Sequence, residues 1–233
     1  MENKKVCEAK RIRKDYIRKG RETNILHAVK ETDYCLYAGE VAVIKGASGS
    51  GKTTLLNVMA GLLTPDAGEV WFFHDGKEHS LYQMEEEERS ALRNRNFGYI
   101  PQGAGAVGSL TVLENILLPQ TIGGREADRD RIDELAGRFG LVALYNEYPA
   151  TLSGGELKRM AIVRALAGKP AVIFADEPTD DLDKENTQTV FEVLRETADA
   201  GAAVLVITHE DTKGLRTDRL LVMKEGVLTQ DTL

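Results

Sequence analysis

The pattern of hydrophobic and polar positions along the chain predicts an α/β fold. Two short runs are apolar on both faces, Ala171–Ala175 and Ala203–Ile207, and a helical pattern over Lys184–Asp199 separates them. Runs of this kind, joined by a helix, are typical of parallel strands buried in a sheet. A third apolar run, Val41–Ile44, ends at a glycine-rich segment that precedes another helical pattern. We therefore expect parallel central strands with helices packed against them.

The N-terminal part has the pattern of an antiparallel β layer. Strand patterns cover residues 6–13, 34–44 and 68–73. The turn signal Thr64–Gly68 precedes the last of them. At the other end of the chain, residues 219–228 have the pattern of a hairpin. The expected sheet core is therefore mixed, with an antiparallel layer near the glycine-rich segment.

The middle of the chain, residues 82–166, is mainly helical in pattern, with breaks near 99–103 and 121–124. A length of 233 residues with 42% hydrophobic content is enough for one domain with an inserted subdomain. We predict a single domain. Its catalytic α/β core covers residues 1–81 and 167–233, and its α-helical subdomain covers residues 82–166.

Composition limits the classes of partner. The net charge of −7 argues against a large nucleic-acid-binding surface, so no nucleic-acid partner is expected. Cys7 and Cys35 lack metal-ligand spacing and are assigned no chemistry. No segment approaches the roughly 20 consecutive apolar residues that cross a bilayer. Any membrane role is therefore expected to come through a partner.

The segment Gly46–Thr53 has the glycine, lysine and threonine spacing of a nucleotide-phosphate loop. Glycines without Cβ atoms let backbone N–H groups meet phosphate oxygens at a helix N-terminus. Lys52 is expected to reach the β- and γ-phosphates, and the Thr53 hydroxyl to bind Mg²⁺. The alternative is an ordinary glycine-rich turn. The predicted nucleotide-binding residues here are Gly46, Ser48, Gly49, Ser50, Gly51, Lys52, Thr53 and Thr54.

Two carboxylates, Asp176 and Glu177, directly follow a buried strand. The carboxyl ends of parallel strands are where ligands bind in open α/β sheets. Asp176 suits a Mg²⁺ contact, and Glu177 suits polarising an attacking water. A charged pair that merely ends a strand is the alternative, but the phosphate loop favours the catalytic interpretation.

The segment Leu152–Glu156 precedes a helical pattern and allows two compatible interpretations. Ser153 and Glu156 have the spacing of a helix capping box. Together with the adjacent glycines Gly154 and Gly155, Ser153 also offers donors at a positive helix end, which predicts a second anion site.

Taken in order, these segments resemble the motif set of an ABC-type ATPase subunit over essentially the whole chain. The matching positions are Gly46–Thr53, Gln102, Leu152–Glu156, Ala171–Glu177, Asp180–Asp183 and Thr208–Glu210. The resemblance implies a P-loop NTPase fold of ABC type, ATP and Mg²⁺ as cofactors, and ATP hydrolysis. It also implies a head-to-tail homodimer in which the Ser153–Gly155 segment of one subunit, followed by Glu156, caps the nucleotide on the other.

The resemblance assigns roles to four more positions. Tyr16 matches the aromatic that stacks on adenine, where a strand aromatic packing on a neighbour is the alternative. Gln102 matches a loop glutamine near Mg²⁺ and the attacking water. His209 matches the switch histidine at the γ-phosphate. Asp183 matches an aspartate of the dimer interface, where an N-cap is the competing role.

The implied catalytic set is therefore Glu177, His209 and Gln102, and the implied metal set is Thr53, Gln102 and Asp176. The chain departs from the family pattern at two places. Glu156 stands where glutamine is more frequent, and Asp180-Asp181 replaces small or amide residues. Neither departure removes a catalytic group, and both add negative charge near the implied dimer interface.

Within the family, Glu87–Arg93 and Leu110–Pro119 resemble the subgroup of lipoprotein-release, macrolide-export and cell-division ATPases. The resemblance implies an integral-membrane permease partner and a cytoplasmic subunit peripheral to the inner face of the cell membrane. We expect a motor for export of a lipoprotein, peptide or drug. The alternative is an ATPase that transmits a mechanical or regulatory signal without transport. A DNA-repair or translation ATPase is disfavoured, because the chain has neither a long coiled-coil insertion nor a second cassette.

Overall fold

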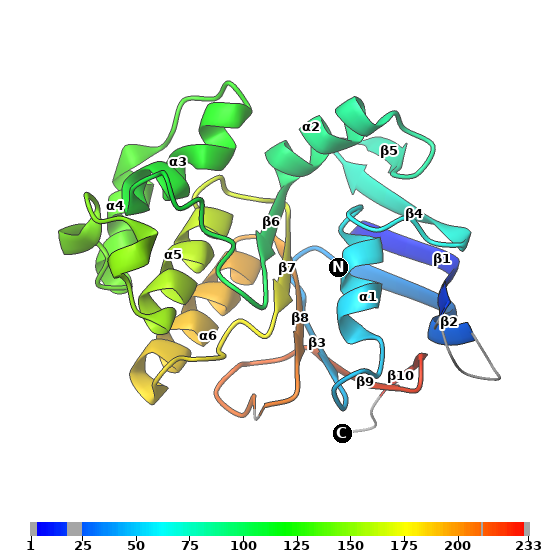
Figure 1. Cartoon of the computed structure of the whole chain (residues 1–233). Coiled ribbons are helices and arrows are strands. Elements are labelled where there is room, and N and C mark those ends of the chain that lie inside the picture. Colours follow the sequence, from blue (N-terminus) through cyan, green and yellow to red (C-terminus); the bar gives the residue numbers. More distant parts are fainter. Residues whose placement is uncertain (1–3, 18–24, 211, 231–233) are drawn as a thin grey trace.

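The computed structural model describes residues 4–17, 25–210 and 212–230, and a six-stranded sheet forms its centre (Figure 1). The strand order is β10-β9-β3-β8-β7-β6, and all neighbouring pairs are parallel except β9 with β10. The predicted parallel strands and the predicted hairpin are therefore confirmed. The strands are β3 (Val41–Lys45), β6 (Phe97–Ile100), β7 (Val172–Asp176), β8 (Ala203–Thr208), β9 (Arg219–Lys224) and β10 (Val227–Gln230).

The second sheet is antiparallel and has the order β2-β1-β4-β5. Its strands are β1 (Lys5–Ile17), β2 (Ile25–Tyr37), β4 (Ala67–His74) and β5 (Lys77–Ser80). The prediction of one strand over 34–44 was wrong. The chain reverses at Gly39, whose φ of 77° lies in the left-handed region that glycine adopts without strain. Residues on its two sides therefore enter different sheets.

Both faces of the six-stranded sheet carry apolar side chains, and helices pack against both of them. In β3, Val41 and Val43 pack into the core that contains α5 and α6, whereas Ala42 and Ile44 pack toward α1 and the antiparallel sheet. In Figure 1, α5 and α6 lie to the left of the central strands and α1 to their right. The helices are α1 (Lys52–Met59), α2 (Glu86–Asn96), α3 (Val112–Ile122), α4 (Arg129–Arg138), α5 (Gly154–Leu166) and α6 (Lys184–Asp199), with short 3₁₀ turns η1 (Val142–Leu144) and η2 (Pro149–Thr151).

The mainly helical segment 82–166 contributes one strand to the central sheet. β6 pairs in parallel with β7, at the first of the two predicted breaks. Gly98 in β6 lies against α5, and a Cβ atom there would sit 2.6 Å from the Ala165 carbonyl oxygen. Glycine is therefore required for α5 to approach this strand so closely.

The parallel strands place the predicted site residues at one edge of the sheet. β3 runs into the glycine-rich loop, β7 ends at Asp176, and β8 ends one residue before His209. β6 ends two residues before Gln102. Because parallel strands share their carboxyl edge, residues separated by more than 160 positions converge there. In the described part of the chain, no helix is both long and apolar enough to cross a membrane.

Candidate active site

A cleft of about 450 Å³ lies at this carboxyl edge of the sheet. Eleven of the predicted site residues line it, which are Tyr16, Ser48, Gly49, Gly51, Lys52, Thr53, Thr54, Gln102, Asp176, Glu177 and His209. Leu26, Ala28 and Ala47 complete the lining and were not anticipated. Gly46 and Ser50 belong to the same loop without lining the cleft. A volume of this size is within the usual range for a small-molecule site.

The glycines of the loop are required by close backbone approaches. A Cβ atom on Gly46 would lie 2.3 Å from the Met223 carbonyl oxygen, and one on Gly51 would lie 1.9 Å from the Ala28 carbonyl oxygen. Gly51 also has a φ of 108° and immediately precedes α1. The loop is thus packed against neighbouring backbone, with its N–H groups at the start of a helix, where anions bind favourably.

The Lys52 ammonium group is held at the inner end of this loop. Its Nζ donates to the carbonyl oxygens of Gly46 at 2.7 Å and Ala47 at 3.2 Å, and the residue is buried. Among the residues that the structure describes, the buried Ser50 hydroxyl has no hydrogen-bond partner. A buried cation held only by neutral carbonyls can form a stronger, charge-assisted bond to a phosphate oxygen. The donor set therefore fits a polyphosphate.

Asp176 and Thr53 also line the cleft. Asp176 is buried at the end of β7. Burial raises the pKa of the Asp176 carboxyl group, and the negative charge of the neighbouring Glu177 raises it further. The Thr53 hydroxyl has the opposite effect, because its hydrogen bond stabilises the charged form. A divalent cation beside these oxygens would offset the cost of burying the charge. Hard oxygen donors of this kind fit Mg²⁺.

Glu177 is held in a strained backbone conformation one residue beyond Asp176. Its φ is +47°, although it carries a side chain and precedes a proline. Its N–H group donates to the Ile207 carbonyl oxygen at 2.9 Å, which fixes the turn against β8. In this conformation the Glu177 carboxylate contacts the segment that follows β8.

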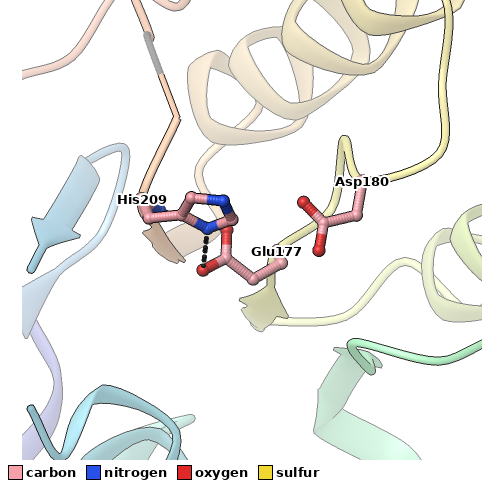
Figure 2. A group of neighbouring side chains, drawn as sticks. All are labelled: Glu177, Asp180 and His209. Atoms are coloured by element: carbon pink, nitrogen blue, oxygen red, sulfur yellow. Dashed lines mark hydrogen bonds and ion pairs between the residues drawn. The ribbon is translucent and has the colours of Figure 1, made fainter. Parts of the chain in front are cut away.

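His209 contacts this carboxylate through its imidazole, as Figure 2 shows, and also through its backbone N–H group. Its Nδ1 lies 2.9 Å from Glu177 Oε1, and its backbone N–H donates to Oε2 at 3.2 Å. The imidazole is exposed, whereas Glu177 is buried. One carboxylate oxygen of Glu177, one carboxylate oxygen of Asp180 and one ring nitrogen of His209 all lie within 4.8 Å of one another. Asp180, one of the two departures from the family pattern, thus adds a second carboxylate near the histidine.

The hydrogen bond and charge of Glu177 raise the pKa of the His209 imidazole above its ordinary range. The ion pair therefore forms below the ordinary pKa of histidine and is lost as the pH rises through the elevated value. We expect the NMR titration of His209 to show this elevated pKa and Glu177→Gln to lower it. An unchanged His209 titration in Glu177→Gln would contradict the pairing.

Tyr16 and Gln102 enter the cleft from different elements. Tyr16 lies near the end of β1, with 39% of its surface exposed and the Lys14 ammonium group 5.9 Å from the centre of its ring. Its ring is thus accessible to a stacking partner. Gln102 is exposed on the loop after β6, and its backbone carbonyl oxygen accepts a hydrogen bond from Lys158 Nζ at 2.9 Å.

Five predicted site residues lie outside the cleft of their own chain, namely Ser153, Gly154, Gly155, Glu156 and Asp183. The Ser153 hydroxyl accepts from the Glu156 N–H, and the Glu156 carboxylate accepts from the Ser153 N–H at 2.7 Å, so the predicted capping box is confirmed. Asp183 accepts from the Asn186 N–H at 2.8 Å as the N-cap of α6. The cap roles that the sequence offered are thus present.

Lys158 is a residue near the site that the sequence analysis missed. It is buried in α5, and its Nζ also donates to the Pro101 carbonyl oxygen at 3.0 Å. No motif marks it. The available signal was its helical spacing, since Ala161 and Ile162, three and four residues later, are completely buried.

Comparison with known proteins agrees with this geometry. The family described as ABC transporter matches residues 29–180. The lipoprotein-releasing system ATP-binding protein LolD of Shewanella frigidimarina is 40% identical over 209 residues, covering 88% of this chain and 84% of the relative. LolD of Idiomarina loihiensis is 34% identical over 229 residues, covering 97% of each chain.

Solved structures show the same fold. The dimeric ATP-binding cassette MJ0796 in a post-hydrolysis state, bound to ADP and Pi, is 31% identical, with a TM-score of 0.84 and coverage of 97% of this chain and 98% of the other. The predicted fold class, ATP and Mg²⁺ as cofactors, and ATP hydrolysis are thereby confirmed. With its phosphate loop, its paired carboxylates and these relatives, the chain belongs to the ABC transporter family as an ATP-binding and ATP-hydrolysing subunit.

Proposed function

We propose that Glu177 is the general base of ATP hydrolysis in this chain. The supporting observation is the buried Glu177 carboxylate, which the strained turn after β7 directs into the cleft beside Asp176. A carboxylate in this position can accept the proton of the attacking water. In the chain without nucleotide, the His209 imidazole is hydrogen-bonded to the Glu177 carboxylate. This contact must therefore loosen before Glu177 can accept a proton from water.

The remaining site residues divide into four roles. Lys52 and the loop residues Gly46, Ser48, Gly49, Ser50, Gly51 and Thr54 bind the phosphates, and Tyr16 stacks on adenine. Thr53, Asp176 and Gln102 hold Mg²⁺, which when bound neutralises phosphate charge. His209, once released from Glu177, donates a hydrogen bond to the γ-phosphate, whose negative charge favours the donor form of the imidazole.

The complete site requires a second copy of the chain. Ser153, Gly154 and Gly155 are at the N-terminus of the 13-residue α5, away from their own cleft. A dimeric relative bound to ADP and Pi supports a head-to-tail arrangement in which this helix end, with Glu156, faces the nucleotide of the partner. Asp183, already the N-cap of α6, lies at the same interface in this arrangement. The segment 82–166 acts as the helical subdomain and residues 1–81 and 167–233 as the catalytic core.

We further propose that the homodimer drives an integral-membrane permease at the inner face of the cell membrane, releasing a lipoprotein. Relatives at 34–40% identity carry the name of a lipoprotein-releasing system. The test is ATP-dependent release of a lipoprotein from vesicles that contain the permease. If the permease stimulates hydrolysis but no lipoprotein leaves the vesicles, the signalling role replaces the transport role.

The loop that contains Gln102 continues into an exposed apolar residue, Val107, which has 38% of its surface exposed. Tyr99, at the start of this region, is instead half-buried and donates to Asn57 Oδ1 at 2.7 Å. An apolar side chain on a loop linked to the cleft suits contact with a partner helix. We propose Val107 as part of the permease-docking surface.

Val107→Asp is expected to abolish co-purification with the permease and permease-stimulated hydrolysis, while ATP binding stays unchanged. The reason is that a carboxylate placed in an apolar contact must lose its hydration. Val227→Asp, an equally exposed position on β10, is the control and should keep both properties. Wild-type stimulation of Val107→Asp would show that the docking surface lies elsewhere.

A further inference from the structure

Two cationic side chains of α5 hold the loop that contains Gln102. Lys158 Nζ donates to the carbonyl oxygens of Pro101 at 3.0 Å and Gln102 at 2.9 Å. Arg164 donates to the carbonyl oxygens of Ala104 and Gly105, each at 2.8 Å. One helix thus binds four of the five carbonyl oxygens from residue 101 to residue 105. We call Lys158 and Arg164 the loop clamp.

The Lys158 ammonium group depends on these hydrogen bonds because it is buried. Lys158 is 3% exposed, and burial lowers the pKa of its ammonium group, an effect that Asp180, Asp176, Asp181 and Glu177 oppose. A buried ammonium group is costly unless its hydrogen bonds are made. Moving the loop away from α5 would leave this group unpaired. The loop and the helix are therefore expected to move together.

The same helix begins at the segment proposed to face the nucleotide of the partner. Ser153 caps α5, and Lys158 lies five residues later, about 7.5 Å along the axis at 1.5 Å per residue. A regular helix over this length is stiff. A displacement of the Gln102 loop is thus carried to Ser153 through Lys158 without another flexible connection.

We propose that Lys158 and Arg164 are positioning residues that join the Gln102 loop to α5 as one moving unit, so that nucleotide contact at Gln102 in one subunit positions the Ser153–Gly155 segment for the nucleotide of the other. This inference rests on the proposed two-chain site. A role limited to fold stability is the competing explanation, and the following measurements separate the two.

The first experiment measures loop mobility in the resting protein. A nitroxide is attached at Gly103→Cys in a Cys35→Ser background, because position 103 is exposed and a Cβ atom there meets nothing within 4 Å, while Cys7 is fully buried. We expect Lys158→Met combined with Arg164→Met to give the narrow spectrum of a mobile label. Lys169→Met, which removes an exposed lysine just beyond α5, is the control and should leave the spectrum unchanged. An unchanged spectrum in the double variant overturns the clamp.

The second experiment separates ATP binding from turnover. Lys158→Met should lower kcat by about tenfold or more, since misplacing a catalytic group has effects of this size. The dissociation constant for ATP without Mg²⁺ should stay at the wild-type value, because the Lys52 loop is untouched. Lys158→Gln, which keeps N–H donors, should recover part of kcat. Parallel loss of ATP affinity and kcat, or a wild-type kcat with a mobile loop, overturns the inference.

Two features keep the result interpretable. If Lys158→Met fails to fold in a thermal melt, Lys158→Gln and Arg164→Gln provide the same comparison with milder changes. The label spectrum concerns one chain without nucleotide, so it tests the clamp independently of the two-chain site. A mobile loop with neither functional complementation nor ATP-dependent crosslinking between subunits would instead contradict the proposed dimer.

Discussion

Glu177→Gln is expected to bind Mg-ATP normally and to lose turnover by about 100- to 10,000-fold, the usual contribution of a general base. Glutamine keeps the shape and the hydrogen bond from the His209 N–H but cannot accept the proton of water. Lys52 and Thr53, which are proposed to bind the phosphates and Mg²⁺, are untouched. Steady-state hydrolysis and ATP-dependent dimerisation should be measured on the same preparation.

The matched control for Glu177→Gln is Asp180→Asn. Asp180 is a second carboxylate of the same turn. One of its oxygens lies within 4.8 Å of a Glu177 carboxylate oxygen and of a His209 ring nitrogen. Its replacement removes a similar negative charge but leaves the proposed base in place, so most of the turnover should remain. Near wild-type hydrolysis by Glu177→Gln would exclude Glu177 as the base. Equal losses in both variants would indicate a general effect of charge.

Mixing Lys52→Ala and Ser153→Arg subunits is expected to restore hydrolysis that neither variant has alone. The Lys52 ammonium group lies in the cleft of its own chain, whereas Ser153 lies outside it. In a mixed dimer, one nucleotide therefore meets an intact Lys52 and an intact Ser153. Random pairing of equal amounts gives about a quarter of the wild-type sites, by the two-fold symmetry of the dimer.

A mixture of Lys52→Ala and Glu177→Gln subunits is the control for this experiment. Both residues line the same cleft of one chain, so no mixed dimer contains an intact site. If hydrolysis requires both sites, complementation fails even in the correct dimer. ATP-dependent crosslinking between Ser153→Cys of one chain and Ser48→Cys of the other then decides. The absence of both activity and crosslink would refute the two-chain site.

Local sequence was sufficient for the elements whose signal is contained in a short segment. The strand before Gly46, the buried strands at β7 and β8 and the capping box at Ser153 all follow from patterns within a few residues. These elements form because apolar faces are buried and because the N–H groups at a helix end find hydrogen-bond acceptors. Both causes act within a single strand or the first turn of a helix.

The boundary errors have equally local reasons. The apolar pattern of residues 34–44 continues through Gly39, so the reversal that separates β2 from β3 was not visible in it. β5 has the polar sequence Lys77–Ser80 and is defined by its pairing with β4. β5 follows β4 after the two-residue turn Asp75-Gly76, so its partner is adjacent in the sequence. This Asp-Gly turn is the hairpin signal that the sequence analysis missed.

By itself, the sequence determined the glycine-rich loop before a helix, the pair of carboxylates after a buried strand and, through the order of its motifs, the family. Only the tertiary structure decided that Glu177 is held by His209, that Ser153 lies outside its own cleft, and that Lys158 binds the Gln102 loop. The physical reason is that these contacts join residues far apart in the sequence: Glu177 and His209 are 32 positions apart, and Gln102 and Lys158 are 56 positions apart. Such contacts depend on which strands become neighbours in the sheet and on which faces their helices bury. Burial of one face of α5 is what places Lys158 within hydrogen-bonding distance of the Pro101 and Gln102 carbonyl oxygens.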